Sequence, residues 1–254
     1  MYRTITALIF GLLLISGCSQ SEEKNTIDEE DKAPVEEYTF STGSFSSGNV
    51  TLPYRAADIA ASSDGKAITV IYLHGGTSKG DDNEKQIQED GVQAIASYLA
   101  RHNMKATLIA PQCPETKSWI GTMLGVLRGL TDTYATRSDH DATRTYIFGG
   151  SMGGTGTWNM LAEYPDLFAA AMPVAGNPTG LDAEAVAQTP FYTVMGTADV
   201  IMSISAVQDF LQEADRYGAV YLMDTEKGWT HENTCKMSYT DTRLDWVFAH
   251  TKKQ

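Results

Sequence analysis

The stretch Arg144–Trp158, RTYIFGGSMGGTGTW, decides how the rest of the chain is interpreted. Its apolar run Thr145–Phe148 predicts a strand, and the spacing of apolar residues over Thr155–Tyr164 predicts a helix. Between them stands GGSMGG (149–154), which contains the pattern Gly-x-Ser-x-Gly. A serine on so tight a strand-to-helix turn exposes its hydroxyl, and glycines two residues before and after it avoid collisions with the strand and the helix. We therefore predict that Ser151 is a nucleophile.

Two other kinds of site also contain a glycine-rich turn. In the first, Ser151 only caps the following helix. In the second, the turn binds phosphate, but the chain has no Gly-x-x-x-x-Gly-Lys-Ser/Thr motif and no Gly-x-Gly-x-x-Gly pattern after its first strand. A nucleophilic serine also needs a base and an orienting acid, so the choice depends on the rest of the chain.

Short apolar runs rich in β-branched residues recur along the chain and alternate with segments of helical spacing. Continuous apolar runs are typical of strands buried on both faces, and they predict a mainly parallel α/β sheet with helices on both faces. Upstream, apolar residues alternate over 38–40 and 50–54, with Gly43 and Gly48 between them, which predicts an antiparallel hairpin at the sheet edge. The other predicted strands are Ala67–Leu73, Ala106–Ala110, Thr145–Phe148, Ala170–Val174, Phe191–Met195 and Val220–Met223.

A ligand of such a sheet lies beyond the carboxyl ends of its strands, so the reactive residues are expected just after the apolar runs. Asp199 follows the run Phe191–Met195, and His231 lies in the segment after Val220–Met223. The chain order Ser151, Asp199, His231 is the order of nucleophile, acid and base in folds with this serine turn. The sequence therefore predicts a catalytic triad of these three residues.

Other acids and histidines fit these roles less well. Asp182 follows an earlier strand, and Asp224 is close to the strand that leads to the base, so both are alternative acids only. The remaining histidines are expected to be structural or solvated. His74 ends the first parallel strand, His102 lies near the end of a helical segment, His140 is at the far end of the nucleophile strand, and His250 is in the terminal helix.

Acyl transfer needs two hydrogen-bond donors directed at the oxyanion of the tetrahedral intermediate. The backbone N–H of Met152, the residue after the nucleophile, is the first expected donor. The second is expected in the loop after the first parallel strand, where Leu73–Gly76 reads LHGG and a backbone without side chains can approach the substrate. We assign this role to the N–H of Gly76, although an ordinary glycine turn has the same sequence pattern.

The chain resembles α/β-hydrolases, and in particular the esterase and predicted-peptidase group related to feruloyl esterases, acetylxylan esterases and carboxylesterases. The resemblance covers most of Ile68–His250 in the family's order and implies the same nucleophile, acid, base and oxyanion roles. Two segments depart from the family's usual sequences, GTSKG (76–80) and HENTC (231–235), and both border the acyl and leaving-group pockets. The matching segments are YLHGG (72–76), GDDNEKQ (80–86), APQCPE (110–115), RTYIFGGSMGGTGTW (144–158), YPDLFAAAMPVAG (164–176) and GTADV (196–200), with Trp119 and His231.

The resemblance implies a serine carboxylic-ester hydrolase that acts through an acyl-enzyme. The segment 175–190 is too short for a cap domain, which favours an open site for short-acyl or feruloyl esters, including esters on polysaccharides. A serine peptidase of the same fold is the alternative, disfavoured because an amine is a poor leaving group. A non-catalytic relative is a third class, disfavoured by the complete triad. Trp119 either stacks on an aromatic or sugar ring of the substrate or is buried and holds its loop.

Composition excludes other classes. The 254 residues are 42% hydrophobic, enough for a sizeable core, and their net charge of -13 has the wrong sign for a nucleic-acid partner. Three cysteines cannot form a disulfide scaffold, and no cysteine or histidine cluster has the spacing of zinc ligands. We therefore expect neither a metal nor a cofactor.

The N-terminal segment resembles the signal peptide of a bacterial lipoprotein. Arg3 precedes the apolar run Ile5–Ile15, which is too short to span a bilayer and leads through Ser-Gly to Cys18. We expect residues 1–17 to be removed, Cys18 to be lipidated, and 18–37 to be an acidic tether of the catalytic domain 38–254. The protein would then be anchored to the bacterial cell envelope, at the outer membrane. It would face the periplasm or, if SQSEE after Cys18 is an export signal, the cell surface.

The other two cysteines, Cys113 and Cys235, follow predicted strand ends on the same edge of the sheet. Export would permit a disulfide between them. The alternative is a pair of free buried thiols, which are common and inert.

Overall fold

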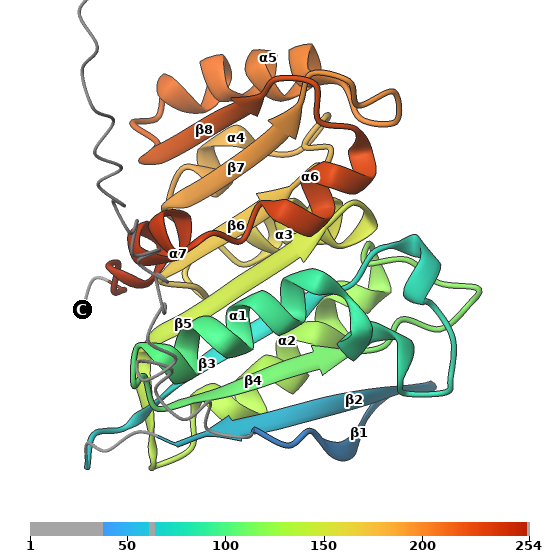
Figure 1. Cartoon of the computed structure of the whole chain (residues 1–254), viewed down its shortest axis with the longest axis vertical. Coiled ribbons are helices and arrows are strands. Elements are labelled where there is room, and N and C mark those ends of the chain that lie inside the picture. The colour runs from blue at the N-terminus through green and yellow to red at the C-terminus, as the bar shows by residue number, and fades with distance from the viewer. Residues whose placement is uncertain (1–37, 61–63, 253–254) are drawn as a thin grey trace, which may run out of the picture. The chain divides into compact units, whose positions relative to one another are not determined.

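The computed structural model describes residues 38–60 and 64–252, all within the compact unit Pro34–Gln254. The strands are β1 (Ser41–Ser47), β2 (Val50–Ile59), β3 (Ala67–Leu73), β4 (Ala106–Pro111), β5 (His140–Gly150), β6 (Ala170–Val174), β7 (Phe191–Gly196) and β8 (Tyr221–Glu226). They form a sheet in the order β1-β2-β4-β3-β5-β6-β7-β8 (Figure 1). β2 is antiparallel to both its neighbours, and the strands from β4 to β8 pair in parallel. The predicted mainly parallel sheet with an antiparallel edge hairpin is confirmed.

Helices cover both faces of this sheet (Figure 1). On one face lie α1 (Asp90–Arg101), α6 (His231–Met237) and α7 (Asp241–Phe248); on the other lie α2 (Thr122–Ala135), α3 (Met152–Glu163), α4 (Ala183–Val186) and α5 (Ile204–Asp215). Each face has its own hydrophobic core, and every residue of β3, β4, β6 and β7 is buried. Burial on both faces explains why these strands are mostly apolar instead of alternating.

The N-terminal hairpin differs in its details from the prediction. β1 begins only at Ser41, and its turn consists of Gly48 and Asn49, with Gly48 at a φ of 57°. Of the two glycines expected between the strands, Gly43 lies in β1 opposite Tyr54, whose ring occupies the space that a side chain at residue 43 would need. A positive φ at a two-residue turn joins antiparallel strands with the correct twist, so the turn forms at Gly48.

The parallel arrangement brings the loops after β3, β5, β7 and β8 to one edge of the sheet. The connection 175–190 between β6 and β7 contains only the short helix α4, so no cap domain is inserted there. Among the described residues, no helix is long and apolar enough to span a membrane. The predictions on residues 1–37, namely the signal peptide, the lipidated Cys18 and the acidic tether, lie outside the described residues.

Candidate active site

Ser151 occupies the sharp turn between β5 and α3, with a backbone φ of 58°. The neighbouring backbones are so close that a Cβ on Gly153 would lie 1.8 Å from the carbonyl oxygen of Leu73, and one on Gly149 would lie 2.5 Å from the backbone of Gly153. The predicted reason for both glycines is thus confirmed. The N–H of Ser151 donates to the carbonyl of Val174 on β6 at 3.0 Å, which holds the turn in this conformation.

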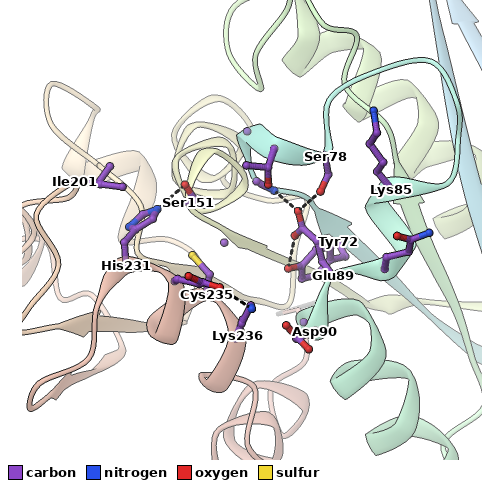
Figure 2. A pocket seen from close by; sticks show the side chains of 17 residues that line it. Tyr72, Ser78, Lys85, Glu89, Asp90, Ser151, Ile201, His231, Cys235 and Lys236 are labelled. Carbon is purple, nitrogen blue, oxygen red and sulfur yellow. Dashed lines mark hydrogen bonds and ion pairs between the residues drawn. The ribbon is translucent and has the colours of Figure 1, made fainter.

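A chain of two hydrogen bonds joins the predicted triad. The hydroxyl of Ser151 donates to Nε2 of His231 at 2.7 Å, and Nδ1–H of His231 donates to Oδ2 of Asp199 at 2.8 Å. Figure 2 shows Ser151 and His231 pointing toward each other at the mouth of a cavity. The side chain of His231 is 15% exposed and that of Asp199 is fully covered, so the acid contacts the imidazole but not the solvent.

Short-range contacts hold both partners of the serine in place. The second carboxylate oxygen of Asp199 accepts hydrogen bonds from the backbone N–H groups of Ile201 and Met202, at 2.8 and 2.9 Å. His231 is the first residue of α6, whose N-terminus has a capping box between Thr230 and Asn233. A capping box fixes the start of a helix, and here it fixes the backbone from which the imidazole projects.

The alternative acids have other roles. Asp182 caps α4 by accepting from the N–H groups of Glu184 and Ala185. Asp224 accepts from the Tyr192 hydroxyl and forms an ion pair with the buried Arg243. Neither carboxylate contacts His231.

The other histidines are structural or partly solvated, as expected. Each forms hydrogen bonds, ion pairs or ring contacts away from Ser151: His74 with Gly75 and Cys113, His102 with Tyr98 and Asp241, His140 with Thr107 and Asp139, and His250 with Trp246.

His74 is fully buried, and its ring is held by two backbone groups. Its Nε2 accepts from the N–H of Cys113 at 2.8 Å, so the ring proton is on Nδ1, which donates to the carbonyl of Gly75 at 2.6 Å. Burial is the main cause that lowers the pKa of His74 from 6.5 to about 4, and the imidazole is therefore neutral at pH 7.

This contact fixes the orientation of the next N–H group. The Gly75–Gly76 peptide is planar and trans, so holding its carbonyl toward His74 directs the N–H of Gly76 to the opposite side. Gly75 is buried, whereas Gly76 is exposed and lines the cavity beside Ser151. Met152 is the first residue of α3, where N–H groups have no partner within the helix.

Trp119 does not reach the substrate space, which corrects its assignment as a possible substrate contact. The side chain is fully buried, and its Nε1–H donates to the carbonyl of His74 at 3.1 Å. The indole also packs against Gly156 of α3 and, edge-on, against the ring of His74. The alternative prediction, a buried tryptophan that holds its loop, is confirmed.

A cavity of about 860 Å³ opens beside Ser151 (Figure 2). Charged side chains in its lining include Lys85, which pairs with Asp82, and Lys236, which pairs with Glu232. Close to His231 the wall contains Ile201, 65% exposed on the loop that follows Asp199. The cavity therefore combines a polar region with one apolar side chain near the nucleophile.

Both cysteines of the described part of the chain are free thiols, as in the second of the two predicted alternatives, but only one of them is buried. Cys113 is buried, and Cys235 lines the cavity next to Gly150. Burial is the main cause that raises the pKa of the Cys113 thiol to about 11 and that of Cys235 to about 12.

Sequence reasoning gave no role to Glu89, a partly buried carboxylate of the cavity wall. It precedes α1 and accepts hydrogen bonds from Gly75, Ser78 and Tyr72. No motif marks it, because an acid just before a helix is common for reasons of helix electrostatics. In the described residues, no group of three or more His, Cys, Asp or Glu side chains is arranged to bind a metal ion.

No protein-family model and no curated protein sequence matches the chain. Solved structures do match, and they show an α/β-hydrolase fold. A thermostable esterase superimposes with a TM-score of 0.73 at 24% identity, over 86% of this chain and 64% of that one. An acylaminoacyl peptidase from Pyrococcus horikoshii superimposes with a TM-score of 0.65 at 14% identity, over 85% of this chain and 42% of that one. A feruloyl esterase module from Clostridium thermocellum, complexed with sinapinate, superimposes with a TM-score of 0.65 at 12% identity, over 85% of this chain and 90% of that one.

The chain thus spans less than two thirds of the first esterase and less than half of the peptidase. At identities this low, the structural similarity shows a shared fold only, and a fold by itself does not determine a reaction.

Proposed function

We propose that the chain is a serine hydrolase that cleaves carboxylic esters through an acyl-enzyme. The observation that carries the proposal is the hydrogen-bonded series Ser151, His231, Asp199 at the mouth of an open cavity. Three features support it. Ser151 lies on a strained turn, Nε2 of His231 accepts the hydrogen bond of the serine hydroxyl, and Asp199 accepts from the other ring nitrogen of His231.

In the acylation step, Oγ of Ser151 attacks the ester carbonyl and its proton passes to Nε2 of His231. The Asp199 carboxylate holds Nδ1–H, keeps the imidazole in the tautomer that accepts at Nε2, and stabilises the imidazolium. The imidazolium then protonates the alcohol as the C–O bond breaks, which leaves the acyl group on Ser151. A water molecule, deprotonated by His231, cleaves this acyl-enzyme and releases the acid.

The oxyanion is stabilised by the N–H groups of Gly76 and Met152. The first comes from the loop after β3 and the second from the N-terminus of α3, where the helix dipole also favours negative charge. Removal of one such donor in other enzymes costs on the order of 10²–10³ in turnover.

The substrate we propose is a short-acyl or feruloyl ester, including esters attached to polysaccharides. The charged side chains in the lining of the open cavity suit a hydrophilic alcohol such as a sugar, and Ile201 supplies an apolar contact near the nucleophile. One solved neighbour is described as a feruloyl esterase, which adds support for this class. The acylaminoacyl peptidase among the neighbours favours the alternative, a serine peptidase of the same fold.

The test has two parts. Ser151→Ala is expected to remove turnover of p-nitrophenyl acetate and labelling by a fluorophosphonate, with an unchanged circular dichroism spectrum. Substantial turnover by this variant, or an adduct on another serine, would contradict the mechanism. Acetyl, butyryl and feruloyl esters are then compared with a chromogenic dipeptide; faster cleavage of the dipeptide would select the peptidase.

We also propose, from the sequence alone, that the enzyme is attached to the cell envelope through lipid on Cys18. Incorporation of a labelled fatty acid into the wild-type chain, and its loss in Cys18→Ser, tests this proposal. Equal incorporation into both would contradict it.

A further inference from the structure

Glu89 is a partly buried carboxylate in the cavity wall that the proposed reaction does not use. It is the residue just before α1, and its side chain extends toward the loop that follows β3 (Figure 2). This loop continues into the short 3-10 helix η2 (Gly76–Ser78) and contains the proposed oxyanion donor. A charged side chain is costly to bury unless hydrogen bonds compensate, so the contacts of Glu89 indicate what it does.

Three donors surround its two oxygens. Oε1 accepts from the backbone N–H of Gly75 at 2.9 Å and from the hydroxyl of Ser78 at 2.6 Å. Oε2 accepts from the hydroxyl of Tyr72, at the end of β3, at 3.0 Å. The two contacts of Oε1 thus lie immediately before and at the end of η2, so one oxygen connects both ends of the oxyanion loop.

The loop is held from the other side as well. The carbonyl of His74 accepts from the indole of Trp119, and the carbonyl of Gly75 accepts from the ring of His74. The N–H of Gly75 donates to Glu89. The peptide groups His74–Gly75 and Gly75–Gly76 therefore both have a fixed orientation, and the second of them carries the N–H of Gly76. Gly76 is the first residue after these contacts whose backbone is exposed to the cavity.

The position of Glu89 is itself set by packing. A Cβ on Gly91, in the first turn of α1, would lie 2.5 Å from the hydroxyl of Tyr72 and 2.6 Å from the ring of Tyr239. The start of α1 is therefore packed directly against the side chains of Tyr72 and Tyr239. The carbonyl of Glu89 also accepts from Val92 and Gln93, which anchors its backbone to the first turn of the helix.

We propose that Glu89 is a positioning residue: its carboxylate fixes the loop 75–78 so that the N–H of Gly76 is directed at the oxyanion before the substrate arrives. Donors fixed in advance stabilise a developing charge without reorganisation, which is the main advantage of an oxyanion hole. The inference rests on the proposed function, because it requires Ser151 to be the nucleophile. It differs from a purely structural role in affecting the transition state more than substrate binding.

The experiment measures the rate at which a fluorophosphonate labels Ser151. In this reaction Oγ bonds to phosphorus, the P–F bond breaks to release fluoride, and the hydroxyl proton goes to His231. The phosphoryl oxygen gains negative charge as an ester carbonyl would, so the rate reports on the oxyanion donors whatever the natural substrate is.

Glu89→Ala is expected to lower the labelling rate and kcat for p-nitrophenyl acetate by about 100-fold, with KM nearly unchanged. Glu89→Gln retains an acceptor oxygen for Gly75 and Ser78, so it should restore most of the lost rate. Glu84→Ala is the matched control: it removes an exposed carboxylate whose ion pair with Arg55 is long, at 4.0 Å, and should keep the wild-type rate.

If Glu89→Ala does not fold, a second pair of variants tests the role of Glu89. Ser78→Ala removes a contact between Glu89 and the loop and should lower the rate by about fivefold, the effect of one hydrogen bond. Tyr72→Phe removes a contact on Oε2 that does not involve the loop and should lower it less.

The outcomes separate the two proposals. Absence of labelling on Ser151 in the wild type would refute the proposed function, and the inference with it. Labelling of the wild type, with equal rates in Glu89→Ala or with a larger loss in Tyr72→Phe than in Ser78→Ala, would overturn only the role of Glu89. A rise in KM at constant kcat would also overturn it.

Discussion

Acid should destabilise this protein through His74, and the size of the effect can be worked out from the structure. The imidazole is fully buried, and its pKa falls from 6.5 to about 4 chiefly through burial. Because the folded state holds the proton less tightly than the unfolded state, the contribution of His74 to stability is complete above pH 6.5. It is lost as the pH falls toward 4.

Linkage between protonation and folding gives the magnitude. Between pH 7 and pH 5, a pKa difference of this size removes about 2 kcal/mol of unfolding free energy. The full loss below pH 4 is about 3 kcal/mol, a large part of the stability of an ordinary domain.

The assay is urea unfolding of the wild type and of His74→Gln at pH 7 and pH 5. The variant has no imidazole to titrate at this position, so its unfolding free energy should decrease by about 2 kcal/mol less over this interval. The absolute stability of the variant does not matter, since only the change with pH is compared and all other groups are common to both proteins. An equal decrease in the two proteins would refute the reasoning, because it would show that the buried ring takes up its proton as readily as in the unfolded chain.

Two further predictions concern the acid and the thiols. Asp199→Asn should lower kcat for p-nitrophenyl acetate on the order of 10⁴-fold with little change in KM, because the amide no longer holds the imidazole tautomer that accepts the serine proton; a comparable loss in Asp182→Asn or Asp224→Asn, with Asp199→Asn active, would show that the acid is another residue. The second prediction uses Cys18→Ser, in which Cys113 and Cys235 are the remaining cysteines. Their raised pKa values leave almost no thiolate at pH 8, so iodoacetamide should react slowly with the native protein. Two thiols should react after denaturation without reductant, and the absence of reactive thiols under that condition would mean a disulfide.

The serine turn was predictable because its constraints are local. Strand, turn and helix follow one another within Arg144–Trp158, and the close backbones around Ser151 leave room only for glycine at 149 and 153. The predictions of β3, β4, β6 and β7 succeeded for a related reason: strands buried on both faces consist mostly of apolar residues, and such runs can be identified in the sequence. The order of the strands then placed Asp199 and His231 at the same edge as the serine.

The sequence predicted the hairpin but did not decide which of two glycines forms its turn. Gly43 and Gly48 look alike until the partner of each is known. Gly43 is required by the ring of Tyr54 on the neighbouring strand, and Gly48 by the positive φ of the turn. The distinction depends on strand pairing, which composition does not encode.

The sequence by itself determined the mainly parallel sheet and the serine turn, and it identified Asp199 and His231 as the partners of Ser151, because each follows from local geometry or from chain order. Only the tertiary structure decided the burial of Trp119 and the contacts of Glu89. The indole bonds to a carbonyl 45 residues away and the carboxylate to an N–H 14 residues away, and both contacts join the loop after β3 to a segment that precedes a helix. A side chain that acts through packing has no spacing rule, so its partners are known only once the elements that bear them have been brought together.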